Sequence, residues 1–83
     1  MNQILVEISV PAMHETMDVY LYPEMQIKDV ISIIKDYLTS YLSGNYDRNS
    51  NSCLCILPQG QRISENYTVS ETELKNGTRL MFY

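Results

Sequence analysis

The sequence predicts an α+β domain in which one helix covers one face of a small mixed β-sheet. Residues 26–44 place apolar side chains every three or four positions, the period of an amphipathic helix. Segments before and after this helix alternate apolar and polar residues, as half-buried strands do. The 83 residues contain no linker, repeat or low-complexity segment. We therefore expect one domain spanning residues 1–83.

The chain begins with two alternating segments that predict an antiparallel hairpin. In residues 3–10 and 16–22, every second side chain is apolar and faces inward. Pro11 ends the first strand because proline has no N–H to donate to a sheet. Residues 11–15 then form a turn of several residues, without the Asn-Gly signature of the tightest hairpins. The inward set is Ile4, Val6, Ile8, Val10, Met17, Val19 and Leu21.

Residues 26–44 predict the helix that the sheet must cover. Gln26 is a poor N-cap, but Asp29 faces the positive end of the helix dipole, and Gly44 suits the left-handed residue that ends a helix. Ile33 and Tyr37 lie on the flank. Several β-branched residues lower the helix propensity, so the helix depends on packing against the sheet. The apolar face comprises Ile27, Val30, Ile31, Ile34, Leu38, Tyr41 and Leu42.

The second half of the chain predicts three further strands. The polar residues 45–52 indicate an exposed loop, residues 53–57 a third strand and residues 61–63 a short fourth strand. Residues 64–77 carry two isolated apolar side chains, Val69 and Leu74, and predict no strand or helix.

Residues 78–83 predict a fifth strand, preceded by a turn at Asn76-Gly77. Leu80 and Phe82 face inward in this strand, and the residues between and beside them face outward. The element order is strand, strand, helix, strand, short strand, strand. We expect the last strand to pair in parallel with the first, which makes it central in the sheet.

Composition excludes several classes of function. Six basic residues are scattered among ten acidic ones, giving a net charge of −4. A nucleic-acid binder would need a basic stripe to contact phosphates. No apolar run approaches the ~20 residues that cross a bilayer, and the N-terminus lacks the features of a signal peptide. We therefore expect a cytoplasmic protein without direct membrane insertion.

The residues that usually carry chemistry are few. Cys53 and Cys55 point to the same face of the third strand and are expected to be reduced thiols. His14 is the sole histidine, so these residues do not make up a zinc-type metal site. Phosphate-binding glycine loops and nucleophile–base pairs are absent from the sequence. We expect no enzyme activity, no metal and no cofactor.

The order of elements resembles the β-grasp, or ubiquitin-like, superfamily. The spacing from Val19 to Pro23 and on into the helix resembles the second strand and helix start of ubiquitin. The second half resembles ubiquitin in its apolar positions and its turn glycine. This resemblance covers nearly the whole chain. The positions that carry it are Val19, Leu21, Pro23, Ile27, Val30, Ile34, Gly60, Gln61, Arg62, Ile63, Val69, Leu74, Gly77, Leu80 and Phe82.

The chain departs from ubiquitin at its end, which bears on function. Conjugated modifiers and sulfur carriers of this superfamily end in a flexible Gly-Gly tail, whereas this sequence ends at Tyr83. A tailless chain of this length most resembles the YukD/EsaB family of bacterial type VII (WXG100, Esx-type) secretion accessories. That resemblance implies a cytosolic protein that contacts secretion machinery, docks on a membrane complex and has no chemistry of its own.

The sequence is compatible with two alternatives. A chain that continued past Tyr83 into a Gly-Gly tail would be a modifier or sulfur carrier. A chain that continued into further domains would be a ubiquitin-like domain of a larger membrane protein.

The resemblance also suggests where a partner protein docks. Partners of ubiquitin-like folds often bind the outer face of the sheet, away from the helix. Leu57, Met81 and Tyr83 are expected there, with Met13 in the adjoining turn. Apolar residues grouped on an outer face mark a binding patch, whereas apolar residues scattered singly are ordinary surface. Tyr20 and Tyr22 share the outward face of the second strand, as a second contact surface or as cover for an edge strand.

Overall fold

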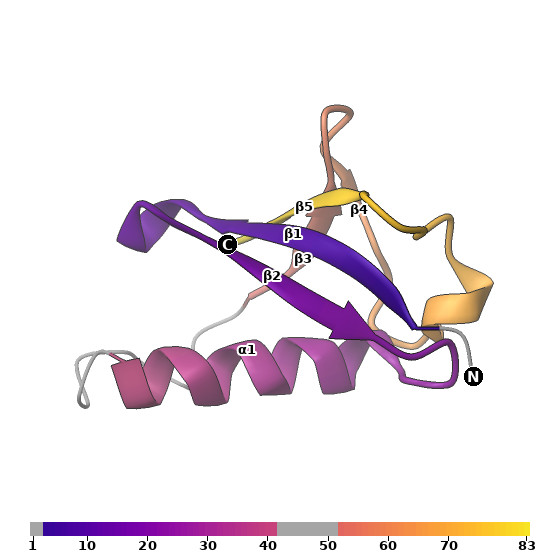
Figure 1. Ribbon diagram of the computed structural model, residues 1–83, viewed down its shortest axis with the longest axis horizontal. Helices are drawn as coiled ribbons and strands as arrows, with labels where there is room; N and C mark the ends of the chain where they lie inside the picture. Colours follow the sequence, from indigo (N-terminus) through magenta and orange to yellow (C-terminus); the bar gives the residue numbers. More distant parts are fainter. Residues whose placement is uncertain (1–2, 42–51) are drawn as a thin grey trace.

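The computed structural model describes residues 3–41 and 52–83, which form a sheet layer and a helix layer (Figure 1). The five strands are ordered β2-β1-β5-β3-β4. Helix α1 (Ile27–Tyr41) lies across one face of this mixed sheet. The predicted α+β class and the predicted order of elements are confirmed.

The N-terminal hairpin follows the alternation in the sequence. Strands β1 (Ile4–Val10) and β2 (Glu15–Leu21) pair antiparallel over seven positions. The predicted turn contains a 3-10 helix, η1 (Pro11–Met13), and ends at His14 with a φ of 52°. The carbonyl of Pro11 accepts a hydrogen bond from the His14 N–H at 3.1 Å. Strand β2 is at the edge of the sheet, where the sequence places Tyr20 and Tyr22.

Strand β5 (Arg79–Phe82) is central, as predicted. It pairs in parallel with β1 and antiparallel with β3 (Leu54–Ile56). The turn before it is held against β1, because the Gly77 N–H donates to the Leu5 carbonyl at 2.8 Å. Gly77 has a φ of 86°, a conformation that favours glycine. Strand β4 (Gln61–Arg62) pairs with β3 at the other edge and is one residue shorter than predicted.

The helix buries the face that its periodicity indicates, with one correction. Ile27, Val30, Ile31, Ile34 and Leu38 are buried. Tyr41 was expected on this face but is 53% exposed, because its hydroxyl reaches outward to Glu15 Oε1 at 3.3 Å. The predicted helix end at Gly44 and most of the predicted loop 45–52 lie outside the described residues.

The start of the helix explains why a poor capping residue suffices. The Ile27 N–H donates to the Tyr67 carbonyl at 2.8 Å, and the Lys28 N–H donates to the Glu65 carbonyl at 3.1 Å. Backbone carbonyls from a distant segment therefore satisfy N–H groups that a side-chain cap would otherwise serve. That segment continues into a second 3-10 helix, η2 (Val69–Glu71), within residues for which we predicted no helix.

The core lies between α1 and the inner face of the sheet. Val69 is 3% exposed and Leu74 packs at the edge of the core, so both isolated apolar residues of segment 64–77 face inward as apolar side chains should. Within residues 3–41 and 52–83, no helix is long and apolar enough to cross a bilayer. The other core residues are Val6, Ile8, Val10, Leu21, Ile27, Val30, Ile31, Ile34, Leu38, Leu54, Ile63, Leu80 and Phe82.

Candidate functional site: the outer face of β3 and β5

The strand register brings three of the four predicted patch residues onto one face. Leu57 follows β3 and its N–H donates to the Arg79 carbonyl at 2.8 Å. Met81 pairs with Cys55 of β3 on one side and with Ser9 of β1 on the other. Alternation along β5 then places Tyr83 on the same face as Met81, because buried Phe82 separates them. This outer face is the side of the sheet opposite α1.

The patch residues differ in exposure. Tyr83 is 56% exposed, whereas Leu57 and Met81 are half-buried. Met13 lies in η1 and packs against the core, so its side chain is only partly available to a partner. Leu57, Met81 and Tyr83 are hereafter called the β3–β5 patch.

The sequence did not reveal that Cys55 is buried beneath this patch. Its side chain points away from the helix, yet Cys55 is 1% exposed. The Tyr83 hydroxyl lies 3.0 Å from Cys55 Sγ and also hydrogen-bonds the Cys53 side chain. These bonds to Cys55 and then Cys53 are the largest causes that raise the pKa of Tyr83 to about 12. Cross-strand pairing was the missing signal, since it places Tyr83 opposite Cys53.

Charged residues border the patch along the neighbouring strands. Arg79 Nε lies 3.3 Å from Glu7 Oε2, and both side chains are largely exposed, so this ion pair contributes little to stability. Arg79 also borders two shallow depressions of about 470 Å³ each. One depression includes Asp18, and the other includes Leu57 and Lys75. An apolar patch with a charged border is the usual anatomy of a protein–protein interface.

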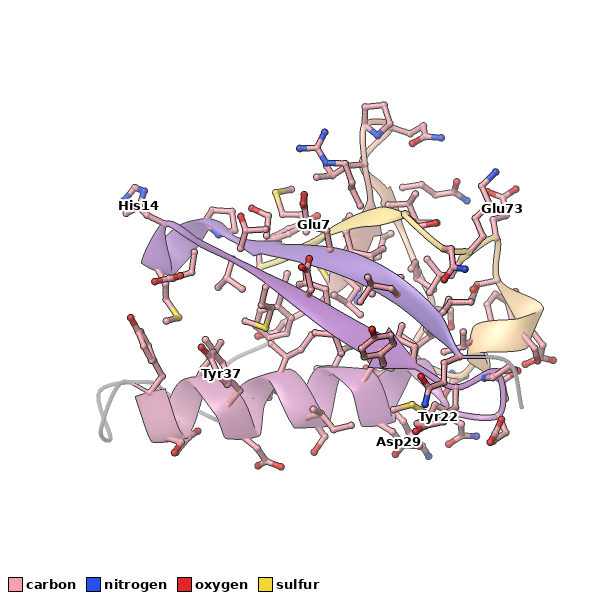
Figure 2. The ribbon with its side chains drawn as sticks, in the orientation of Figure 1. Glu7, His14, Tyr22, Asp29, Tyr37 and Glu73 are labelled. Carbon is pink, nitrogen blue, oxygen red and sulfur yellow. The ribbon has the colours of Figure 1, made fainter. Side chains whose placement is uncertain are left out.

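The described part of the chain contains no group of three or more His, Cys, Asp or Glu residues that would hold a metal ion. His14 is exposed at the tip of the β1–β2 hairpin (Figure 2). In these same residues, the other resolved pKa shifts also have local causes. The negative charge of Glu15 and then its hydrogen bond raise the pKa of Tyr41. Hydrogen bonds from the backbone and side chain of Thr68 lower the pKa of Glu71.

Four other exposed tyrosines lie on or beside edge strand β2 and on helix α1. Tyr20 and Tyr22 are on or beside edge strand β2, and the Tyr22 hydroxyl accepts a hydrogen bond from Gln3 Nε2 at 2.8 Å. Tyr37 rises from the flank of α1 that faces β2 (Figure 2) and stacks on Tyr41, with ring centroids 5.8 Å apart. Strand β1 lies between Tyr20 on β2 and the β3–β5 patch.

No protein-family model matches this sequence, and no curated protein matches it significantly. Solved structures do match its fold. The ubiquitin-like domain of the Mycobacterium tuberculosis type VII secretion system protein ECCD1 is 14% identical, with a TM-score of 0.69 over 99% of this chain and 98% of that chain. A chain of the MycP5-free ESX-5 inner membrane complex is 12% identical, with a TM-score of 0.69. That match covers 100% of this chain but only 21% of the longer one.

The same architecture also occurs in a different functional setting. A chain of the toluene 4-monooxygenase HD complex with the inhibitor 4-bromobenzoate is 9% identical, with a TM-score of 0.79 over 98% of this chain and 96% of that chain. At these identities the likeness establishes the architecture alone, and function has to be argued from the surface residues. The helix on a five-stranded mixed sheet with a central last strand, together with these matches, shows that the chain has the ubiquitin-like, β-grasp fold.

Proposed function

We propose that this chain is a non-enzymatic ubiquitin-like interaction module that serves a bacterial type VII secretion system. The observation that carries this proposal is the likeness, over 99% of the chain, to the ubiquitin-like domain of a type VII secretion protein. The YukD/EsaB resemblance in the sequence supports the same assignment. On this proposal the protein is a cytoplasmic accessory that docks on a membrane complex, and the ESX-5 match supports that location.

The β3–β5 patch is the proposed docking surface. A central, rigid strand holds Met81 and Tyr83, so the patch is presented without the cost of ordering a loop. Tyr83 offers an exposed aromatic ring, the kind of residue that is enriched where binding energy concentrates. Met13, in the neighbouring hairpin, packs against the core and can add only its exposed part to this surface. The partner is a protein component of the secretion machinery.

The absence of chemistry is part of the proposal. In the described residues, the charge of Glu15 raises the pKa of Tyr41, bonds from Thr68 lower that of Glu71, and bonds to two cysteines raise that of Tyr83. All three shifted groups belong to exposed residues and not to an enclosed catalytic pocket. Binding without catalysis is supported by this pattern. A sensitive assay for hydrolysis or transfer by the purified protein should find none.

A second assignment follows from the coverage of the ESX-5 chain. Because this chain matches only 21% of that protein, the same fold also serves as one part of a longer membrane-complex chain. The reading frame after Tyr83 distinguishes the assignments. A stop codon supports the accessory protein, further domains support a ubiquitin-like domain of a larger protein, and a Gly-Gly tail supports a modifier or sulfur carrier.

Affinity capture from the native cell tests the proposed function. The bait is the wild-type chain, with a Leu57→Glu/Tyr83→Glu variant and a Tyr20→Glu control on the opposite edge. We expect WXG-type proteins, an FtsK-like ATPase or other secretion components to be enriched by the wild type and the control, and lost with the double variant. Enrichment of none of these by the wild type would contradict the proposal.

A further inference from the structure

Three sulfur-bearing side chains meet on the outer face of β3 and β5. Cys55 lies directly across from Met81 in the antiparallel ladder. The ladder extends one pair beyond β3, because Cys53 and Tyr83 exchange two backbone hydrogen bonds of 2.7 and 3.1 Å. Cys53 and Cys55 are therefore two residues apart on one face, and directly opposed side chains in such a ladder have Cβ atoms about 5 Å apart. Two thiols and one thioether occupy neighbouring positions.

Tyr83 covers one of the two thiols. The Tyr83 hydroxyl lies 3.0 Å from Cys55 Sγ. Cys53, which pairs with Tyr83 through the backbone, lies on the same face and is partly exposed. Cys55 is 1% exposed although it faces away from the core, so Tyr83 and its neighbours shield its thiol from solvent. A small ligand that replaced the hydroxyl would contact Cys55 Sγ in a sheltered position, with Cys53 and Met81 at the adjacent positions of the ladder.

The spacing of the cysteines suits a bridging cation better than a disulfide. On one face of a strand, the Cβ atoms of residues two apart are about 6.6 Å apart, because their side chains are parallel. A disulfide brings its Cβ atoms to about 3.8 Å, so it would require strand β3 to bend. A metal ion with two bonds of ~2.3 Å holds its sulfur ligands as much as ~4.6 Å apart, which side-chain rotation on a straight strand can reach.

The donor atoms select the type of cation. Zn²⁺ in structural sites takes four ligands, and the described residues offer no group of three among His, Cys, Asp and Glu. Thiolate and thioether sulfur atoms together are the soft donors that favour Cu(I). We propose that Cys53, Cys55 and Met81 form a binding site for one Cu(I) ion. Binding releases the two thiol protons and displaces the Tyr83 hydroxyl, a hard oxygen donor.

An anaerobic titration of the full chain tests the site, with Cu(I) supplied in competition with the chromophoric chelator bicinchoninate. We expect one equivalent to bind, and X-ray absorption of the complex to show three sulfur neighbours. Cys53→Ser should lower the affinity by about 100-fold or more, because one of the two charged ligands is lost. Met81→Leu should lower it by about tenfold, because one neutral soft ligand is lost. Met17→Leu, a matched change on β2, should leave the affinity unchanged.

The Tyr83→Phe variant tests whether the bound ion displaces the Tyr83 hydroxyl or is coordinated by it. Its affinity for Cu(I) should rise by up to about fivefold, because no hydrogen bond to the thiols has to be broken. A fall in affinity would make the hydroxyl a ligand and overturn the three-sulfur site.

The proposal fails under any of three further outcomes. One is that the Cys53→Ser/Cys55→Ser variant still binds Cu(I). Another is that Met81→Leu has the same Cu(I) affinity as Met17→Leu, and the third is that Zn²⁺ binds the wild type as tightly as Cu(I). Circular dichroism of each variant shows that it is folded. If Cys55→Ser does not fold because position 55 is buried, the partly exposed Cys53→Ser variant decides alone.

Discussion

The side-chain oxygen of Asn76 accepts a hydrogen bond from the Leu5 N–H at 2.8 Å, joining residues that are 71 positions apart. Gly77, the next residue, returns a backbone hydrogen bond to the Leu5 carbonyl. Together these bonds fix the start of β5 against β1 and hence the parallel register of the two strands. That register decides which β5 side chains face the helix and which form the β3–β5 patch.

The Asn76 contact should be measurable in stability. Asn76→Ala is expected to lower the free energy of unfolding by about 0.5–1.5 kcal/mol, the net contribution of one hydrogen bond. Asn66→Ala, at an exposed turn position, serves as the control and should change it by less than about 0.5 kcal/mol. Urea denaturation measures both. Equal effects of the two substitutions would argue against a register-fixing role for Asn76.

Adjacent helix positions give a sharper test of the packing. Ile34 is 1% exposed and Ile33 is 48% exposed. Ile34→Ala should destabilise the protein by about 2–5 kcal/mol through lost burial and a cavity, whereas Ile33→Ala should cost less than about 1 kcal/mol. Chemical denaturation of the two variants compares the same change of residue on the buried face and on the exposed flank of α1. A larger loss of stability for Ile33→Ala than for Ile34→Ala would show that Ile33, and not Ile34, packs against the sheet.

The capping box of η2 predicts a pH dependence. The Thr68 N–H donates to Glu71 Oε1 at 2.8 Å, and this bond is the main cause of the lowered pKa of Glu71. Because the folded-state pKa is lowered, the carboxylate stabilises the fold above its unfolded pKa and loses that effect as the pH falls through the folded pKa. The stability gap between wild type and Glu71→Gln should therefore close on acidification. Melting temperatures across the acid range measure it, and a gap that widened in acid would refute the assignment.

The raised pKa of Tyr83 predicts a loss of stability at high pH, whereas the lowered pKa of Glu71 predicts one in acid. Hydrogen bonds to Cys55 and Cys53 favour the protonated phenol and raise its pKa from 10.0 to about 12. The stabilisation is fully present below pH 10 and is lost as the pH rises toward 12. The tyrosinate absorbance of wild type minus Tyr83→Phe should titrate near pH 12, and Cys53→Ala/Cys55→Ala should return this step toward pH 10. A difference step at pH 10 in the wild type would contradict the contact.

Period and alternation were sufficient to predict the architecture. Each strand was placed to within one or two residues, and the central position of β5 followed from the order of elements. These patterns succeed because apolar residues on a buried face recur in the sequence with the period of the helix or strand. The 3-10 helix at Val69–Glu71 was missed because a single turn is too short to show a period.

The site was only partly predictable. Met81 and Tyr83 were placed on the outer face by alternation along the last strand, a local property, and Leu57 by the resemblance to ubiquitin-like folds. The burial of Cys55 beneath Tyr83 was not foreseen, because it depends on which residues of β3 and β5 stand opposite each other. Tyr41 was misplaced for a related reason. It lies at the margin of the helix face, where its ring stacks on Tyr37 and its hydroxyl bonds Glu15.

The affinity of the captured partner for patch variants tests the central claim most directly. Dissociation constants would be measured for wild type, Leu57→Glu/Tyr83→Glu and Tyr20→Glu, with circular dichroism confirming that each is folded. If the β3–β5 patch is the docking surface, the double variant should bind at least about 100-fold more weakly, a loss of roughly 3 kcal/mol, and Tyr20→Glu should bind like wild type. Unchanged binding by the folded double variant, or a loss confined to Tyr20→Glu, would contradict the account.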